Sequence, residues 1–579
     1  MKVLLCALTL SMVCFSGTLS AMGLLKADLI GVWGEKRILG PYVSGVLDIR
    51  LDASGGTAEI DGQVGAVNRQ GANVSLELAN AQGAFRGQIY GDTLTGHWIQ
   101  PRTMAYGTIY ATPVSFRLLS ANHWQGEVNP LEDAMTFYLA VSYDEDSNLT
   151  AYFRNPERNA GRFMTVKRIS IDSNTVTFLS GSGEVIATGQ FSPEDQCLSV
   201  FLPWAGGTYD FSKHTTEQLE GFSPRPEDEQ PYRYRPPISL PDGWPVATIG
   251  DVGISSDSIG KFIQMLCEMP MQSIHSLDLH GILIARRGRL VLEEYFHGYH
   301  RNEPHDTRSA SKTVTSTLMG AAIARGYPLD ESTPIYATMI GVDSARTLDP
   351  RKQALTTGHL LTMSSGLDCD DSDQESPGNE DVMQEQTIEP DWVKYTMGLD
   401  MIRDPGEKAV YCSCNPNLLG GVMSKSTGKW LPELFDELIA EPMQFGHYAL
   451  NLMPNREGYT GGGARLLPRD FLKLGQMMLD DGKWNGKRIV SSQWAERASS
   501  RLVELEGHGY GYYWWNVSYP DGHDSVTAFF AGGNGGQIVM VIPELEIVVG
   551  FFGGNYSDMV YLTPQRNYVP NYIIPAVIR

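Results

Sequence analysis

The chain has 579 residues, so about two or three domains are expected. Hydrophobic residues make up 42% of the sequence, which is enough for packed cores, and 61 glycines and 32 prolines do not reach the level of a disordered chain. The formal net charge of −22 at pH 7 argues against a nucleic-acid partner, because such a partner binds a basic face.

Residues 1–21 have the pattern of a secretory signal peptide. Lys2 supplies a positive charge, Val3 to Phe15 are apolar, and the small residues that end at Ala21 suit cleavage. The apolar stretch is shorter than a membrane span, and no later segment reaches about 18 uninterrupted apolar residues. We therefore expect an exported protein, periplasmic or secreted, without a transmembrane segment.

Residues 27–215 have short alternating apolar and polar runs separated by glycine, asparagine and aspartate turns, which predicts β-structure. The segment also repeats itself, because a strand around Trp33 opens one half and a similar strand around Trp124 opens the other. We expect two similar barrel-like or sandwich-like units, residues 27–120 and 121–215. Their predicted role is open: a carbohydrate or lipid contact, a packing partner or a lid.

Residues 216–250 are rich in proline and poor in apolar residues, which indicates an extended linker. In residues 251–579 the pattern changes to strands at both ends with helical periods between them, including residues 311–325 and 468–479. This order predicts an α+β domain in which the terminal strands share one antiparallel sheet flanked by helices.

Two of the seven cysteines lie within the predicted signal, which leaves an odd number. An exported protein with an odd number keeps at least one thiol unpaired. Three possibilities stay open: a disulfide between Cys369 and Cys412, a disulfide between Cys369 and Cys414, or buried free thiols. The spacing of these residues fits neither a redox pair nor a zinc site, so we expect no metal and no cofactor.

The nucleophile motif GxSxG of α/β-hydrolases is absent. The alternative motif, Ser-x-x-Lys, occurs three times, at residues 258–261, 309–312 and 426–429. Such a pair places a hydroxyl and an amine on one helix face, where a desolvated amine takes the hydroxyl proton. Only Ser309 opens a long apolar helix that buries Lys312, so we predict Ser309 as nucleophile.

Residues 308–316, Arg-Ser-Ala-Ser-Lys-Thr-Val-Thr-Ser, resemble the nucleophile segment of the serine beta-lactamase and penicillin-binding-protein superfamily. The resemblance is greatest to its class C-like esterases and 6-aminohexanoate-dimer hydrolases, and it spans roughly residues 242–560. Further matching segments follow in order: 242–245 (DGWP), 292–296 (LEEYF), 360–367 (LLTMSSGL) and 405–408 (PGEK). This resemblance implies a beta-lactamase-like fold for the C-terminal domain.

In that superfamily a Tyr-x-Asn or Tyr-x-Ser triplet supplies a second base, and Tyr411-Cys412-Ser413 stands at the corresponding place. The resemblance thus implies Tyr411 as a catalytic residue, its phenol pKa lowered by Lys312, and Ser413 as a lining of the substrate pocket. Two aromatic residues, Tyr512 and Trp514, are expected on a cleft wall or in the core.

The superfamily's Lys-Thr-Gly strand is replaced by a glycine-rich stretch around Gly533 and Asn534. Their backbone N–H groups are still expected to form an oxyanion hole together with the amide of Ser309. The missing lysine removes the cation that holds the carboxylate of a beta-lactam or peptide. We therefore expect an acyl-enzyme on Ser309 that cleaves a small ester or amide; a beta-lactamase or D-peptidase and a non-catalytic binding protein are the alternatives.

Aspartates 368, 370, 371 and 373 form an acidic run. A solvated loop is its default interpretation, and a contact to a substrate amine is the functional alternative.

Overall fold

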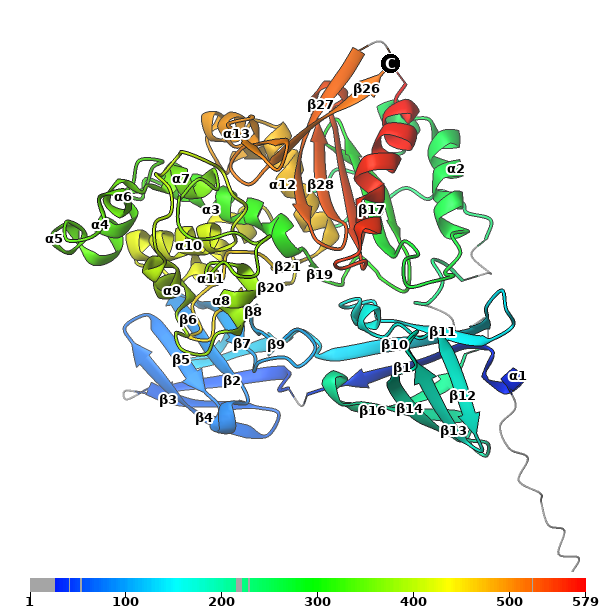
Figure 1. Cartoon of the computed structure of the whole chain (residues 1–579). Helices are drawn as coiled ribbons and strands as arrows, with labels where there is room; N and C mark the ends of the chain where they lie inside the picture. The colour runs from blue at the N-terminus through cyan, green and yellow to red at the C-terminus, as the bar shows by residue number, and fades with distance from the viewer. Residues whose placement is uncertain are drawn as a thin grey trace, which may run out of the picture.

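The computed structural model describes residues 26–40, 42–52, 55–214, 221–226, 230–522 and 524–578. The predicted signal peptide lies outside these residues. Figure 1 shows the catalytic part above two β-rich lobes. Within the described residues, no helix has the length and apolar character that a membrane span requires.

The first lobe is a closed antiparallel barrel. Its strands are β2 (Gly45–Asp52), β3 (Gly55–Ile60), β4 (Gln63–Gln70), β5 (Asn73–Glu77), β6 (Ala84–Tyr90), β7 (Thr93–Ile99), β8 (Ile109–Ser120) and β9 (His123–Val128). Strand β9 pairs with both β8 and β2 and closes the barrel. Alternating side chains point inward, and large ones such as Phe85, Trp98 and Trp124 fill the interior.

The second lobe is an antiparallel sheet in the order β11-β10-β1-β16-β15-β14-β13-β12. Its strands are β1 (Gly31–Ile38), β10 (Ala134–Tyr143), β11 (Leu149–Arg154), β12 (Arg168–Asp172), β13 (Thr175–Leu179), β14 (Val185–Ser192), β15 (Cys197–Leu202) and β16 (Gly207–Lys213). The expected all-β region with barrel-like sheets is therefore present. Its aromatic core includes Trp33, Phe137 and Phe153.

The two lobes exchange their opening strands. Strand β1, which begins the first half of the sequence repeat, pairs with β10 and β16 of the second lobe. Strand β9, which begins the second half, closes the barrel of the first lobe. The expected boundary between residues 120 and 121 consequently does not separate the two sheets, because each lobe is completed by a strand from the other half.

The catalytic domain is built on an antiparallel sheet in the order β18-β17-β29-β28-β27-β26-β25-β24. These strands are β17 (Leu279–Arg286), β18 (Arg289–Tyr295), β24 (Val503–Leu505), β25 (His508–Tyr510), β26 (Trp515–Asp521), β27 (Asp524–Gly533), β28 (Gln537–Ile542) and β29 (Ile547–Gly553). First and last strands thus pair within one sheet, as the sequence order predicts.

Helices cover both faces of this sheet. One face packs on α2 (Ser256–Cys267) and the C-terminal helical segment Pro564–Ile573. The other face packs on α12 (Pro468–Leu479) and on a helical lobe. The helices of this lobe are α3 (Lys312–Ala324), α4 (Ile335–Ile340), α5 (Val342–Ala345), α6 (Pro350–Ala354), α7 (Thr357–Leu361), α8 (Glu380–Glu385), α9 (Trp392–Gly398), α10 (Cys414–Thr427) and α11 (Leu431–Phe435). Helix α13 (Ser492–Ser499) lies beside the sheet.

The barrel sheet continues into the catalytic domain without interruption. Barrel strand β8 pairs with β20 (Tyr448–Leu452), β20 pairs with β21 (Arg465–Leu466), and β21 pairs with β19 (His305–Asp306). Strand β19 ends three residues before Ser309, as the numbering shows. The barrel is therefore joined by backbone hydrogen bonds to the segment that carries the nucleophile.

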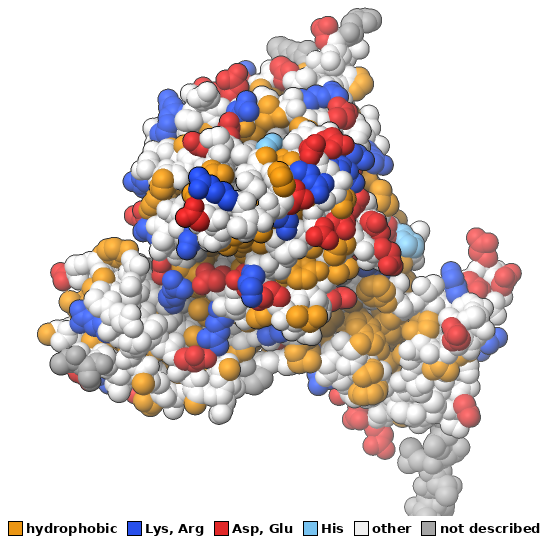
Figure 2. Space-filling view, turned by 60° about the vertical axis from the view of Figure 1, so that its left-hand side comes forward, with side chains coloured by type: hydrophobic (Ala, Val, Ile, Leu, Met, Phe, Trp, Pro, Cys, Tyr) orange, Lys and Arg blue, Asp and Glu red, His pale blue; other side chains and the backbone are white. Residues whose placement is uncertain are grey.

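The described part of the linker lies against the catalytic domain. Tyr232 donates a hydrogen bond to Glu294 at 2.7 Å and Tyr234 donates to the Val291 carbonyl at 2.8 Å, so the segment follows strand β18. Figure 2 shows acidic and basic side chains interspersed over one face, without a large area of a single charge.

Candidate active site

Ser309 lies in a tight turn directly before helix α3. The turn Arg308–Ser311 is a 3-10 helix, and Arg308 adopts a positive φ of 47°. The Ser311 hydroxyl and the Gly463 amide both donate to the Arg308 carbonyl at 2.9 Å. Because a non-glycine residue rarely adopts this backbone conformation, the surrounding bonds must hold it, and they fix the orientation of Ser309.

Lys312 occupies the first position of α3, one helical turn beyond the nucleophile. Its ammonium group donates a hydrogen bond to the Ser309 hydroxyl oxygen at 3.0 Å. The lysine is only 1% exposed, and the helix is buried on all sides from Lys312 to Ala322. The structure therefore brings the predicted nucleophile and its predicted partner together in a site shielded from water.

Tyr411 is the third member of the group. Its hydroxyl lies close enough to Ser309 and Lys312 for both side chains to influence the phenol pKa, and its ring centroid lies 5.0 Å from the lysine nitrogen. The ring stacks on Trp515 with centroids 5.9 Å apart and planes 18° apart. The disulfide Cys369–Cys412 ties the neighbouring residue to the loop before α8.

The protonation of this group differs from the sequence-based expectation. Burial lowers the pKa of Lys312, but Tyr411, Glu380 and Asp371 together raise it above its ordinary value. Burial likewise raises the pKa of the Tyr411 phenol, and the opposing effect of Lys312 does not overcome it. At neutral pH the amine and the phenol therefore both hold their protons, and the base forms when the pair loses one.

A pair of partly buried carboxylates, Asp371 and Glu380, explains the charge on Lys312. Asp371 accepts hydrogen bonds from the Ser413 amide at 2.8 Å and from its hydroxyl at 2.6 Å, and the same hydroxyl lies 3.1 Å from Glu380. Tyr459 donates to Glu380 at 2.5 Å. Burial and the nearby Glu380 charge raise the pKa of Asp371 to about 6. Asp371 is thus a partly buried member of the site and not a solvated loop residue.

Glu380→Gln is expected to shift the pH profile of hydrolysis toward lower pH. The substitution removes a negative charge that raises the pKa of Lys312, so the deprotonated base forms at lower pH. In the wild type, kcat/KM for an ester is expected to rise between about pH 8 and pH 11, because the pKa of Lys312 and that of Tyr411 are both raised, and the variant's rise is expected about one pH unit earlier.

The measurement is kcat/KM for p-nitrophenyl acetate across this range, with the background rate of Ser309→Ala subtracted. Glu385→Gln is the matched control, because Glu385 is exposed at the other end of the same helix. An unchanged profile, or a rise at higher pH in Glu380→Gln, would contradict the assignment.

The glycine-rich end of strand β27 passes close to the nucleophile turn. A Cβ atom on Gly533 would lie 2.5 Å from the Thr307 carbonyl oxygen and 2.9 Å from the Ala310 amide nitrogen, so only glycine fits. The Asn534 side chain is bound to Ser557, whose amide donates to it at 2.6 Å. This approach agrees with backbone donors at Gly533 and Asn534, whose role as an oxyanion hole stays a prediction.

Three residues expected to line the substrate pocket are fully buried. The Ser413 hydroxyl is 0% exposed and bound to the carboxylates. Tyr512 donates to Glu331 at 2.7 Å and is 1% exposed, while Trp514 is 0% exposed and packs on Phe529. Both aromatic residues therefore belong to the core. The aromatic side chain that contacts Tyr411 is the next one in the sequence, Trp515.

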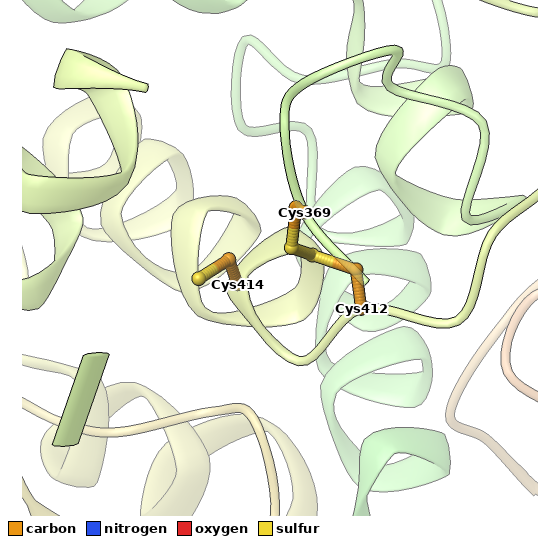
Figure 3. Close-up of side chains that lie close together, drawn as sticks. All are labelled: Cys369, Cys412 and Cys414. Carbon is orange, nitrogen blue, oxygen red and sulfur yellow. A yellow bond between two sulfur atoms is a disulfide. The ribbon is translucent and has the colours of Figure 1, made fainter. Parts of the chain in front are cut away.

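The cysteines show one disulfide and one adjacent thiol. Cys369 and Cys412 are bonded, and Cys414 lies beside them (Figure 3). Within the described chain, these three form the only group of at least three histidine, cysteine or acidic residues close enough to share a metal ion. Two of its three sulfur atoms are in the disulfide, so the donor set does not fit a zinc site.

Several known proteins are similar to part of this chain. Residues 279–555 match the family model described as Beta-lactamase. A curated 6-aminohexanoate-dimer hydrolase from Paenarthrobacter ureafaciens is 27% identical over 230 residues, which cover 37% of this chain and 55% of that protein. The chain thus spans about half the length of this relative.

Two solved structures have similar chains. A candidate 6-aminohexanoate-dimer hydrolase from Bacillus anthracis has a TM-score of 0.44 at 19% identity, covering 58% of this chain and 89% of its own. A class C beta-lactamase has a TM-score of 0.41 at 13% identity, covering 56% of this chain and 96% of its own.

Residues 279–555 contain the Ser309, Lys312 and Tyr411 group and carry the match to the family model. This segment, a little under half of the chain, is therefore similar to the Beta-lactamase family.

Proposed function

We propose that the protein is an exported hydrolase that cleaves a small ester or amide through an acyl-enzyme on Ser309. The observation that carries the proposal is the 3.0 Å contact between the Lys312 ammonium and the Ser309 hydroxyl, with the Tyr411 phenol close to both. A nucleophile with two proton-transfer groups in reach is the arrangement that acyl transfer requires.

The proposed reaction has two steps. Once the Lys312–Tyr411 pair has lost a proton, it accepts the proton of Ser309 as the hydroxyl oxygen attacks the substrate carbonyl carbon. The pair then protonates the leaving alcohol or amine, and the acyl group remains on Ser309. Water, activated by the same pair, attacks the acyl-enzyme and releases the acid. Backbone N–H groups of Ser309 and the Gly533 region stabilise the oxyanion in both steps.

The substrate class is inferred from what the site lacks and what it keeps. The glycine-rich end of β27 has no lysine at the place where the superfamily's Lys-Thr-Gly strand has one. The carboxylate of a beta-lactam therefore has no lysine to pair with at this place, while the groups needed for acyl transfer remain. This favours ester or amide hydrolysis over beta-lactamase or D-peptidase activity, and it disfavours a purely non-catalytic binding role.

We expect the purified protein to hydrolyse p-nitrophenyl acetate much faster than a chromogenic cephalosporin. The measurement compares kcat/KM for the two substrates in the same buffer, with Ser309→Ala as the blank. A ratio of at least about 100 in favour of the ester would support the proposal, corresponding to about 2.7 kcal/mol of transition-state stabilisation. A ratio that favours the cephalosporin would establish the beta-lactamase alternative, and no hydrolysis of either would support the binding protein.

A further inference from the structure

Four arginines gather where the second β lobe meets the nucleophile segment: Arg158, Arg162, Arg308 and Arg465. Two of them, Arg308 and Arg465, approach the same carboxylate, Asp306, at 3.1 and 3.7 Å. Arg158 instead donates to the Ala105 carbonyl at 2.6 Å. This arginine cluster is a local excess of positive charge in a chain whose net charge is −22.

Neither Arg158 nor Arg162 has a carboxylate within ion-pairing distance among the residues that the structure describes. Arg158 is exposed and Arg162 is half-buried, so both can reach a ligand. Burial lowers the pKa of each guanidinium, and the nearby Arg308 charge lowers it further. An anion placed between these groups would remove that repulsion.

Tyr556 fixes the cluster beside the catalytic group. Its carbonyl accepts hydrogen bonds from Asn159 at 3.0 Å and Arg162 at 3.3 Å, both from the second lobe. Its ring lies 4.4 Å from the Arg308 guanidinium carbon. The same ring packs against Gly535, where a Cβ atom would come within 2.5 Å of it. Arg162 is thereby held next to both the residue before Ser309 and the glycine-rich loop.

The surroundings of Arg162 are apolar as well as cationic. The guanidinium carbon lies 4.5 Å from the ring centroid of Phe163, which is 72% exposed. An alkyl chain that ends in a carboxylate matches this combination, because the chain covers the apolar ring and the planar guanidinium binds the carboxylate through two parallel hydrogen bonds.

We propose that Arg162 and Arg158 of the second β lobe, together with Arg308, bind a free carboxylate on the substrate of Ser309. The inference rests on the proposed function and names its substrate class: esters or amides whose acyl part carries a carboxylate. It also gives the second lobe a role, because the cation that the glycine-rich strand lacks is supplied from the N-terminal region.

The test compares two esters of equal acyl length, p-nitrophenyl valerate and mono(p-nitrophenyl) glutarate. The wild type is expected to prefer the glutarate ester in kcat/KM by about tenfold or more, and Arg162→Gln is expected to reduce that preference about tenfold. Arg158→Gln is expected to reduce it less, because that side chain is more exposed. Arg168→Gln, an exposed arginine of the same lobe, is the matched control and is expected to leave the preference unchanged.

A second measurement tests carboxylate binding at the arginine cluster without hydrolysis. Binding of glutarate to Ser309→Ala is measured by calorimetry and repeated with Ser309→Ala/Arg162→Gln, and the second dissociation constant is expected to be about tenfold higher. If neither ester is hydrolysed but this difference persists, the proposed function fails and the subsite stands. No preference for the glutarate ester in the wild type, or equal glutarate binding by the two variants, overturns the subsite.

Discussion

Ser309→Ala is expected to abolish ester hydrolysis and labelling by a fluorophosphonate probe, with kcat/KM reduced by at least about 10⁴-fold. The probe forms a covalent bond only with an activated hydroxyl, and Ser309 is the hydroxyl held 3.0 Å from the buried Lys312 ammonium. The measurement is fluorescence of the labelled band beside the hydrolysis rate, and circular dichroism checks that the variant is folded.

The chain supplies its own controls for this experiment. Ser258→Ala and Ser426→Ala alter the two other Ser-x-x-Lys motifs and are expected to keep both labelling and activity. The exposed Ser258 hydroxyl donates to Ser255 at 2.9 Å, while the lysine of the same motif, Lys261, pairs with Asp257 at 2.8 Å. Labelling that persists in Ser309→Ala, or disappears in Ser258→Ala, would contradict the assignment.

Lys312→Met is expected to lower kcat/KM by about 10³-fold, because the variant loses the proton-transfer group in contact with Ser309. It also leaves the partly buried carboxylates of Asp371 and Glu380 without their cation, so a lower melting temperature is expected. Hydrolysis of p-nitrophenyl acetate and thermal unfolding are measured together.

Lys312→Arg separates the catalytic effect from the stability effect. The guanidinium keeps the positive charge but stays protonated at all accessible pH values, so it cannot accept the Ser309 proton. A variant that is stable and still inactive supports the role of Lys312 in proton transfer. Lys261→Met is the matched control from the exposed motif, and activity within about tenfold of wild type in Lys312→Met would contradict that role.

The nucleophile could be predicted from sequence because the decisive difference between the three motifs is local. The apolar residues that follow Lys312 predict a buried helix, and the structure buries that lysine to 1% exposure. The carboxylates beside it could not be predicted. Asp371 looks like its neighbours in an acidic run. Glu380, the first residue of α8, contacts Ser413, directly before α10, only through the tertiary fold.

The sequence does not indicate which aromatic residue contacts Tyr411 or which cysteine pairs with Cys369. The run Tyr510-Gly-Tyr-Tyr-Trp-Trp515 does not alternate, so its pattern does not show which ring lies beside Tyr411, and the structure selects Trp515. Cys412 and Cys414 are two residues apart and equally placed to reach Cys369. The structure pairs Cys412 and leaves the Cys414 sulfur 3.3 Å from that of Met383.

The sequence repeat predicts two similar β units, but similarity does not determine which copy of a strand completes which sheet. The strands around Trp33 and Trp124 are equivalent in the repeat, so each is compatible with either lobe. Only the pairing of β1 with β10 and of β9 with β2 distinguishes the exchanged arrangement from two independent units.

The exchanged strands determine the order in which the N-terminal region can fold. The barrel cannot close until residues 123–128 have been synthesised, and the second sheet must keep β1 available until β16, residues 207–213, has emerged. One edge of β1 thus stays unpaired, and open to other chains, until residues 39–206 have been added. The second sheet is therefore completed only after the barrel strands have been synthesised, and neither lobe can be inherited, lost or transplanted by cutting the gene between the two repeats.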